Sequence, residues 1–115
     1  MEDCIFCKIV KGEIPCDKLI ETDNFIVIKD VKPQVKGHSL VIPKKHFETF
    51  LDLPTLFFNE FMDTTKTATL KLMKETNSSG FNLVMNNYKV AGQIVPHAHL
   101  HILPRSEGDG FKVSL

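Results

Sequence analysis

The 115-residue sequence contains no tryptophan and only one tyrosine, and its 14 basic residues balance 14 acidic ones. A chain without net charge shows no sign of a surface that attracts nucleic acid or an anionic membrane, so neither is expected as a partner. No apolar run approaches the roughly 18 residues that indicate a transmembrane helix. The acidic start, Met1-Glu2-Asp3, does not resemble a secretory signal. We therefore expect a cytoplasmic location, with the nucleus as an additional location in a eukaryote.

Cysteine is also scarce, with three residues in the chain. An odd number of cysteines without a secretory signal indicates a reducing compartment, where Cys4 and Cys7 are metal ligands or free thiols rather than a disulfide. Two cysteines separated by two residues supply half of a tetrahedral zinc site. No second pair lies nearby in the sequence, so both interpretations stay open from composition alone. Cys16 is interpreted as an ordinary thiol.

An apolar content of 43% predicts one small domain over residues 1–115 with a real core. A short helix is expected over 4–11, capped by Asp3 and ended by Gly12. Helical spacing of apolar residues predicts one long amphipathic helix from about 53 to 75. Apolar runs separated by turn residues predict five strands, over 18–21, 25–30, 38–43, 81–86 and 95–103. The expected class is α+β: a five-stranded antiparallel sheet with one long helix and one short N-terminal helix.

The most informative segment alternates three of the five histidines, His97, His99 and His101, with apolar residues. Alternation is typical of a strand with the imidazoles on one face, about 6–7 Å apart. A catalytic zinc held by all three is one interpretation, but His97 and His101 would stand ~13 Å apart at the backbone. Phosphate chemistry is the other, in which one imidazole attacks phosphorus and its neighbours stabilise the oxygens. The spacing favours the second.

Residues just upstream strengthen the phosphate interpretation. Gly92 lets the backbone approach a ligand closely, and Asn86 and Gln93 add neutral hydrogen-bond donors. Alone they are ordinary turn residues; beside the histidine row they become candidate phosphate contacts.

The segment His97-Ala98-His99-Leu100-His101-Ile102-Leu103 matches the signature of the histidine triad (HIT) superfamily, and the chain resembles this family over nearly its whole length. Further matching segments are residues 4–15, 37–46 and 91–93. Within the superfamily the chain is similar to the Hint branch and to microbial HIT hydrolases with a Cys-x-x-Cys opening. The third histidine is present, unlike in the nucleotidyltransferase branch, and the paired cysteines are unlike the diadenosine-polyphosphate hydrolase branch.

The resemblance implies a role for each histidine of the triad. His99 matches the nucleophile that attacks the α-phosphate, and His101 matches the histidine that contacts the phosphate and stabilises the transition state. His97 matches the histidine that orients the nucleophile. His38 matches a buried histidine behind the triad that completes a relay, and we expect His97 to face it.

The resemblance also implies a nucleotide pocket. Asp30 matches the acidic residue that binds both ribose hydroxyls. The implied phosphate-side contacts are Asn86, Gly92, Gln93 and the backbone N–H of Ile94. The implied purine slot, whose residues taken alone are typical of a core, consists of Phe6, Ile9, Ile14, Ile28 and Val31. Ile94 departs from the Hint branch, which has a serine there, because its side chain cannot relay a proton to the leaving group.

The implied reaction is hydrolysis of purine nucleoside 5′-phosphoramidates through a covalent nucleotidyl-histidine, releasing AMP without a catalytic metal. The alternatives are a nucleotide-binding scaffold protein with incidental hydrolysis, a dinucleoside polyphosphate hydrolase, and a hydrolase with zinc at the triad. Relatives with the paired cysteines hold a structural zinc at the positions filled here by Cys4, Cys7, His46 and His97. Family members form homodimers, which is the expected assembly.

Overall fold

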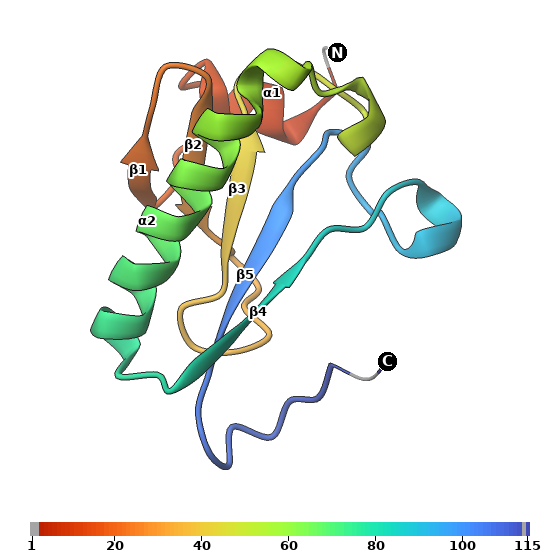
Figure 1. The fold of residues 1–115 in the computed structure, drawn as a ribbon. Coiled ribbons are helices and arrows are strands. Elements are labelled where there is room, and N and C mark those ends of the chain that lie inside the picture. Colours follow the sequence, from red (N-terminus) through yellow and green to blue (C-terminus); the bar gives the residue numbers. More distant parts are fainter. Residues whose placement is uncertain (1–2, 114) are drawn as a thin grey trace.

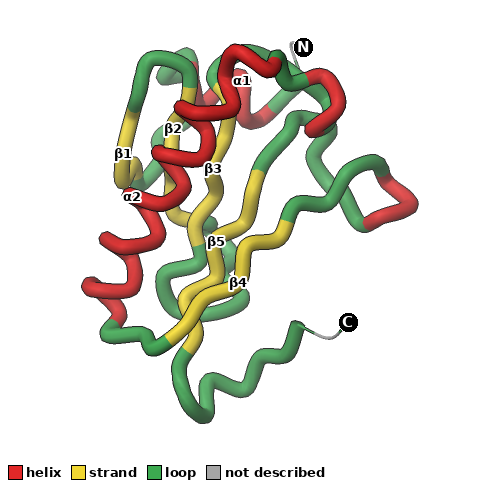
Figure 2. Tube along the Cα trace, viewed as in Figure 1, coloured by secondary structure: helices red, strands yellow, loops and turns green. Residues whose placement is uncertain are grey.

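The computed structural model describes residues 3–113 and 115, and it confirms the predicted α+β class. The strands are β1 (Lys18–Glu21), β2 (Phe25–Lys29), β3 (Ser39–Pro43), β4 (Gly80–Val84) and β5 (Leu100–Arg105). Two helices accompany them, α1 (Ile5–Val10) and α2 (Phe58–Thr76). The strands form one sheet in the order β1-β2-β3-β5-β4, and the paired neighbours run antiparallel (Figures 1 and 2). None of the helices described is long and apolar enough to cross a membrane.

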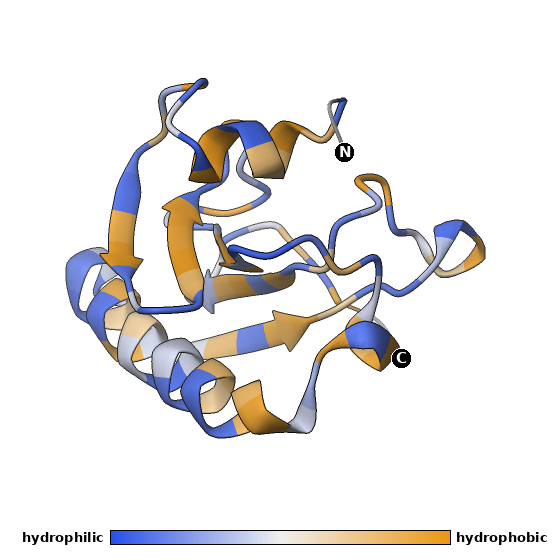
Figure 3. Cartoon of the chain, turned by 90° about the horizontal axis from the view of Figure 1, so that it is seen from above, coloured by the Kyte–Doolittle hydropathy of each residue, from blue (hydrophilic) through white to orange (hydrophobic). Residues whose placement is uncertain are grey.

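Both faces of the sheet are covered, which explains the unbroken apolar run of β2. Phe25 and Val27 belong to a core cluster with the long helix α2, whereas Ile26 and Ile28 belong to a second cluster with Phe6 of α1. Because successive side chains of a strand point to opposite faces, a strand buried on both faces needs apolar residues at every position. In Figure 3 the strands at the centre of the sheet are mostly hydrophobic, while α2 alternates between hydrophobic and hydrophilic residues.

The predicted start of α1 is wrong in one detail. Cys4, rather than Asp3, is the N-cap, and its sulfur accepts a hydrogen bond from the Cys7 N–H at 3.4 Å. Gly12 follows the helix with a φ of +80°, as its predicted role requires. The cap therefore places both cysteines of the motif at the same end of a short helix.

The long helix begins later than predicted. Two 3₁₀ turns, Phe50–Asp52 and Thr55–Phe57, precede α2, and Pro54 between them is extended, with a ψ of 140°. Proline has no N–H for a helical hydrogen bond and is tolerated only at the start of a helical turn, so the regular helix cannot extend back across it. The apolar spacing from residue 53 continues through the 3₁₀ turns and does not reveal the interruption.

The last strand also begins later than predicted, at Leu100, so that only His101 of the triad lies in β5. The chain turns at Pro96, where the His97 N–H donates to the Val95 carbonyl at 2.8 Å. The Ala98 N–H then donates to the Phe47 carbonyl at 2.6 Å, outside the sheet. The alternation of histidines is real, but its first two members precede the strand: His97 lies in a bend and His99 in a segment without regular structure.

Glu60, in the first turn of α2, joins this helix to the turn between β1 and β2. Its carboxylate accepts hydrogen bonds from the Thr22 hydroxyl at 2.6 Å and from the Asn24 N–H and side-chain amide, each at 2.7 Å. Burial by itself would raise the pKa of Glu60, but these hydrogen bonds outweigh it and lower the pKa below its usual value.

We expect Glu60→Gln to lower the free energy of unfolding at pH 7 by about 2 kcal/mol, because hydrogen bonds to a charged acceptor are lost. A carboxyl group with a lowered folded pKa stabilises the fold above its ordinary pKa, about 4.3, and this contribution disappears as the pH falls further. Urea titrations at pH 7 and pH 3 should show the difference shrinking at pH 3. Glu75→Gln, at a surface pair with Lys29, is the control and should change stability by less than about 0.5 kcal/mol. Equal stabilities of wild type and Glu60→Gln at pH 7 would contradict the assignment.

Candidate functional site

All five histidines of the chain lie near the ends of β3 and the start of β5. His38 precedes β3, and its ring lies 5.1 Å from that of His101, which is 5.0 Å from that of His99. His46 follows β3, and its ring lies 4.8 Å from that of His97. The structure thus brings together the residues of the predicted catalytic set and divides them into two neighbouring groups.

His97 faces the two cysteines of the N-terminal motif. Its Nδ1 lies 3.2 Å from the Cys4 sulfur, 3.6 Å from the Cys7 sulfur and 3.2 Å from Nδ1 of His46. The opposite nitrogen, Nε2, lies 2.8 Å from the Pro43 carbonyl oxygen. A carbonyl only accepts, so Nε2 carries the proton and Nδ1 presents its lone pair to the cluster. Burial lowers the pKa of His97 to about 4, and the imidazole is therefore neutral at pH 7.

These four residues satisfy the requirements of a metal centre. One ligand atom each from Cys4, Cys7, His46 and His97 lies within 4.8 Å of the others. Two sulfurs and two imidazole nitrogens form a donor set typical of tetrahedral zinc. The bond from His97 to Pro43 is the outer contact that commonly orients a metal-bound histidine. Burial and the neighbouring Cys4 raise the pKa of the Cys7 thiol, so metal binding there must displace a proton.

His99 is oriented by a backbone group. Its Nδ1 lies 2.7 Å from the carbonyl oxygen of His97, so Nδ1 carries the proton and Nε2 carries the lone pair. Burial lowers the pKa of His99 below its ordinary value, which favours the neutral form. Phe6 of α1 packs edge-on against this imidazole, with ring centroids 5.0 Å apart. The side chain therefore has the protonation state that a nucleophilic imidazole requires.

His38 pairs with His101 rather than with His97, which corrects the expectation that His97 faces His38. The His38 Nε2 lies 2.9 Å from Nδ1 of His101, and a carboxylate oxygen of Asp30 lies 3.5 Å from the same His38 nitrogen. Burial and the neighbouring His99 and His38 lower the pKa of His101 to about 4. The predicted ribose-binding carboxylate is thus in contact with the relay behind the triad.

The loop before the triad is held by the side chain of Gln93. Its amide nitrogen donates to the carbonyls of Glu48 at 2.6 Å and Val95 at 3.1 Å, and its amide oxygen accepts from the Tyr88 N–H at 2.7 Å. The sequence did not predict this role of Gln93, because its three hydrogen-bond partners are backbone groups, which a motif of side chains does not show. Gly92 has a φ of +96°, and a Cβ added there would lie 3.4 Å from the Asn86 amide nitrogen, which explains the glycine. The side chain of Gln93 thus connects this loop to the backbone at three points.

Ile94, in the same loop, is 91% exposed. Its aliphatic side chain has no hydroxyl and so cannot supply a proton as a serine at this position would. Ile94 also lines a cavity together with Glu48, Lys89, Gly92, Gln93 and Pro96.

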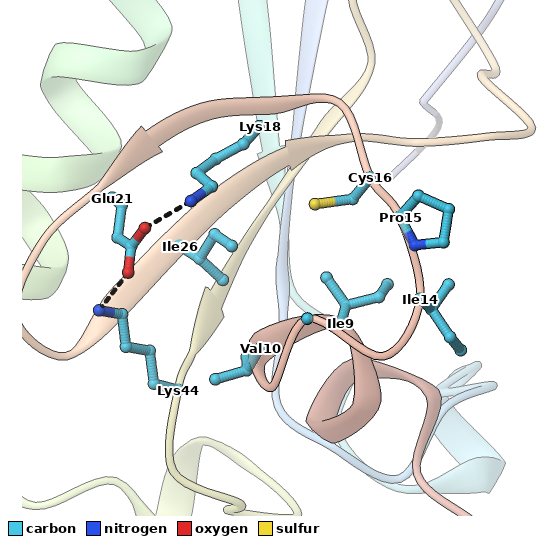
Figure 4. Close-up of a pocket in the computed structure, with 10 residues that line it drawn as sticks. Ile9, Val10, Ile14, Pro15, Cys16, Lys18, Glu21, Ile26 and Lys44 are labelled. Carbon is cyan, nitrogen blue, oxygen red and sulfur yellow. Dashed lines mark hydrogen bonds and ion pairs between the residues drawn. The ribbon is translucent and has the colours of Figure 1, made fainter.

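The residues of the predicted purine slot lie in three settings. Phe6 and Ile28 are buried together in the α1-side cluster, whereas Val31 is 89% exposed directly after Asp30. Ile9 and Ile14 line a cavity of about 230 Å³ between α1 and the β1–β2 hairpin (Figure 4). At the rim of this cavity Glu21 binds Lys18 at 2.6 Å and Lys44 at 2.7 Å. Cys16 and Ile26 also line this cavity, and neither is among the site residues predicted from the sequence.

A five-stranded antiparallel sheet that carries three alternating histidines into one strand defines a histidine triad protein of the α+β class. The family model described as HIT domain matches residues 11–108. The chain belongs to this family.

Relatives of known name cover most of the chain. It is 46% identical over 107 residues to a HIT-like protein of Methanocaldococcus jannaschii, covering 93% of this chain and 82% of that protein. It is 43% identical over 107 residues to an adenylylsulfatase of Arabidopsis thaliana, covering 93% of this chain but only 54%, about half, of that protein. It is 41% identical over 102 residues to an adenosine 5′-monophosphoramidase of Schizosaccharomyces pombe, covering 89% and 74% of the two chains.

Solved structures agree with the fold. A protein of Streptococcus mutans superimposes with a TM-score of 0.95 at 37% identity, covering 100% of this chain and 73% of that one. A zinc-bound histidine triad family protein of Mycobacterium smegmatis superimposes with a TM-score of 0.85 at 35% identity, covering 96% and 81%.

Proposed function

We propose that this protein is a purine nucleotide-binding hydrolase that cleaves nucleoside 5′-phosphoramidates through a covalent nucleotidyl-histidine at His99 and releases AMP. The observation that carries the proposal is the bond from Nδ1 of His99 to the His97 carbonyl, which leaves a neutral imidazole with its lone pair on Nε2. The S. pombe relative named adenosine 5′-monophosphoramidase, at 41% identity, supports the same reaction.

The reaction has two displacements at phosphorus. In the first, Nε2 of His99 forms a bond to the α-phosphorus, the P–N bond breaks, and the amine leaves after taking up a proton. In the second, water forms a bond to the phosphorus and gives up a proton to the solvent, which replaces the proton that the amine took up from the solvent. The bond to His99 then breaks and AMP is released. His101, whose ring lies 5.0 Å from that of His99, stabilises the charge on the phosphate oxygens in both steps.

The nucleotide would be held by groups that surround the histidines. Asp30 would accept hydrogen bonds from both ribose hydroxyls, which a carboxylate with two oxygens suits. Asn86, Gly92, Gln93 and the N–H of Ile94 would line the phosphate, while Phe6, Ile9, Ile14, Ile28 and Val31 would contact the purine. The high exposure of Val31, 89%, is consistent with a side chain that a bound base covers.

We further propose that Cys4, Cys7, His46 and His97 hold a structural zinc ion. The donor set and the mutual distances of the four ligand atoms support it, as does the zinc-bound relative of M. smegmatis. A four-coordinate ion with four protein ligands has no open position for water and supplies no catalytic group. Its contribution would be to attach α1 to the sheet.

A homodimer is also proposed, as is a cytoplasmic location. The dimer is supported by the edge strand β4, where Phe81 is 47% exposed and Leu83 is 46% exposed beside an unpaired backbone edge. Such an edge is usually covered or paired.

A second candidate reaction is hydrolysis of adenylylsulfate, which the A. thaliana relative named adenylylsulfatase favours at 43% identity. Sulfate is a weak base and leaves without taking up a proton. The aliphatic side chain of Ile94, which donates no proton, is compatible with such a leaving group.

Release of AMP tests these proposals directly. Purified protein should release AMP from adenosine 5′-phosphoramidate in the presence of a chelator, since the triad needs no metal. Parallel reactions with adenosine 5′-phosphosulfate and diadenosine tetraphosphate rank the leaving groups. AMP binding without turnover of any of the three would reject hydrolysis and favour a nucleotide-binding scaffold protein.

A further inference from the structure

The backbone N–H of Gln34 fixes the proton position on His38. This N–H donates to Nδ1 of His38 with a nitrogen–nitrogen distance of 3.1 Å. An amide N–H only donates, so Nδ1 must carry a lone pair. His38 is 97% buried, since only 3% of it is exposed, and burial lowers its pKa, so the ring is neutral. A neutral imidazole with a lone pair on Nδ1 carries its proton on Nε2.

The same reasoning extends to His101. Nε2 of His38 lies 2.9 Å from Nδ1 of His101, and since Nε2 carries the proton, it donates and Nδ1 of His101 accepts. The proton of neutral His101 then sits on its Nε2, the ring nitrogen that does not face His38. A carboxylate oxygen of Asp30 at 3.5 Å from His38 Nε2 only accepts, which agrees with the proton being on that nitrogen.

The turn that follows Gln34 is held by a backbone hydrogen bond and by packing against α2 and β5. The His38 N–H donates to the Val35 carbonyl at 3.1 Å, which closes the turn over residues 35–38. Gly37 within it has a φ of +85°, and an added Cβ would lie 2.7 Å from a methyl group of Thr76 and 3.2 Å from Pro104. No larger residue fits there without displacing its neighbours, so the turn packs directly against α2 and β5.

We propose that Gln34 is a positioning residue whose backbone N–H, acting through His38, holds His101 in the tautomer with its proton on Nε2. This inference rests on the proposed function, in which His101 contacts the phosphate. With the proton on Nε2 the ring donates to a phosphate oxygen, whereas the other tautomer would present a lone pair to an anion. The wrong tautomer of a catalytic histidine is known to abolish most of its contribution even when its geometry is intact.

The tautomers can be measured in the wild-type protein itself. Protein labelled with nitrogen-15 in histidine, with its metal bound, should show His38 and His101 both protonated at Nε2 and unprotonated at Nδ1, with and without AMP. Detection of His101 protonated at Nδ1 would overturn the inference. Because this measurement needs neither turnover nor a variant, it stands whether or not the substrate is assigned correctly.

Two substitutions at the same position test the catalytic consequence. Gln34→Pro removes the N–H, whereas the conservative variant Gln34→Ala keeps it. In the phosphoramidate assay we expect Gln34→Pro to lower kcat at least about 10-fold, since misdirecting one donor costs part of the 10²–10³-fold that removal of a donor costs. The KM of Gln34→Pro should change less than about 3-fold. Gln34→Ala should have the kcat and the histidine tautomers of the wild type.

The outcomes separate the two proposals. Equal kcat in the proline and alanine variants, with both folded, would overturn the role of the Gln34 N–H. If the proline variant does not fold, the wild-type tautomers decide the question. Absence of turnover in the wild type would overturn the proposed function, and comparing the tautomers of the wild type, Gln34→Pro and Gln34→Ala would still decide whether Gln34 sets the state of His101.

Discussion

Replacing His99 by alanine should lower the turnover of adenosine 5′-phosphoramidate by at least ~10⁴-fold, about 5.5 kcal/mol in the barrier. The imidazole that the His97 carbonyl holds with its lone pair on Nε2 is the proposed nucleophile, and alanine offers none. The remaining hydrogen-bond donors and the pocket are unchanged, so AMP should bind within a few-fold of the wild-type affinity. Steady-state turnover and calorimetric titration with AMP measure the two quantities.

A matched variant distinguishes loss of the nucleophile from damage to the site. His99→Gly leaves a space for free imidazole, and added imidazole should restore turnover in this variant with saturation behaviour. Rapid quench into alkaline denaturant, in which a phosphorus–imidazole bond survives, should trap the nucleotide on wild-type protein and not on His99→Ala. Turnover of His99→Ala within 10-fold of the wild type would reject covalent catalysis at this residue.

Removal of the proposed zinc should lower the free energy of unfolding by about 4 kcal/mol, the stabilisation that a ligand supplies at a thousand times its dissociation constant. Cys7 is only 8% exposed, and its sulfur lies 3.3 Å from Nδ1 of His46. Serine is similar in size to cysteine, so the free energy of unfolding of Cys7→Ser should equal that of the metal-free wild type. Adding zinc should not stabilise this variant. Thermal melts with and without zinc, together with metal analysis, test both statements.

Cys16→Ser is the control for this experiment, because Cys16 lies outside the group of four ligands. It should retain one equivalent of zinc and the wild-type response to added metal. Purified wild-type protein with less than about a tenth of an equivalent of zinc, and no rise in melting temperature on zinc addition, would contradict a structural metal.

The sequence predicts the architecture well because its main elements have local signals. The apolar run of β2 is buried on both faces, and the histidine row does lead into β5. The breaks at Pro54 and Pro96 shift the start of α2 and of β5, since a periodic pattern continues through an irregular turn of similar spacing. Local patterning thus identifies elements better than it identifies their ends.

The resemblance implies which residues form the candidate site, but not the hydrogen bonds that connect them. It supplied the triad and the four proposed metal ligands, and the structure places the members of each group close together. What it did not supply are the backbone partners: the carbonyls of Pro43 and His97 and the N–H of Gln34, which determine the tautomers of three histidines. These groups occur in every residue and carry no signal in side-chain motifs. The same reason explains why Gln93 could not be recognised as the side chain that holds the loop.

Phe6 lies between Cys4 and Cys7 in the sequence, and its ring packs edge-on against those of His97 and His99, with ring centroids 5.7 Å and 5.0 Å apart. A helix of six residues is far too short to persist alone in water, so α1 keeps its shape only while docked. We expect brief undocking of this segment to expose the proposed metal ligands and to remove one wall around the proposed nucleophile in a single event, without unfolding of the sheet. Amide hydrogen exchange in α1 should therefore report the lifetime of the proposed catalytic geometry separately from the global stability of the fold.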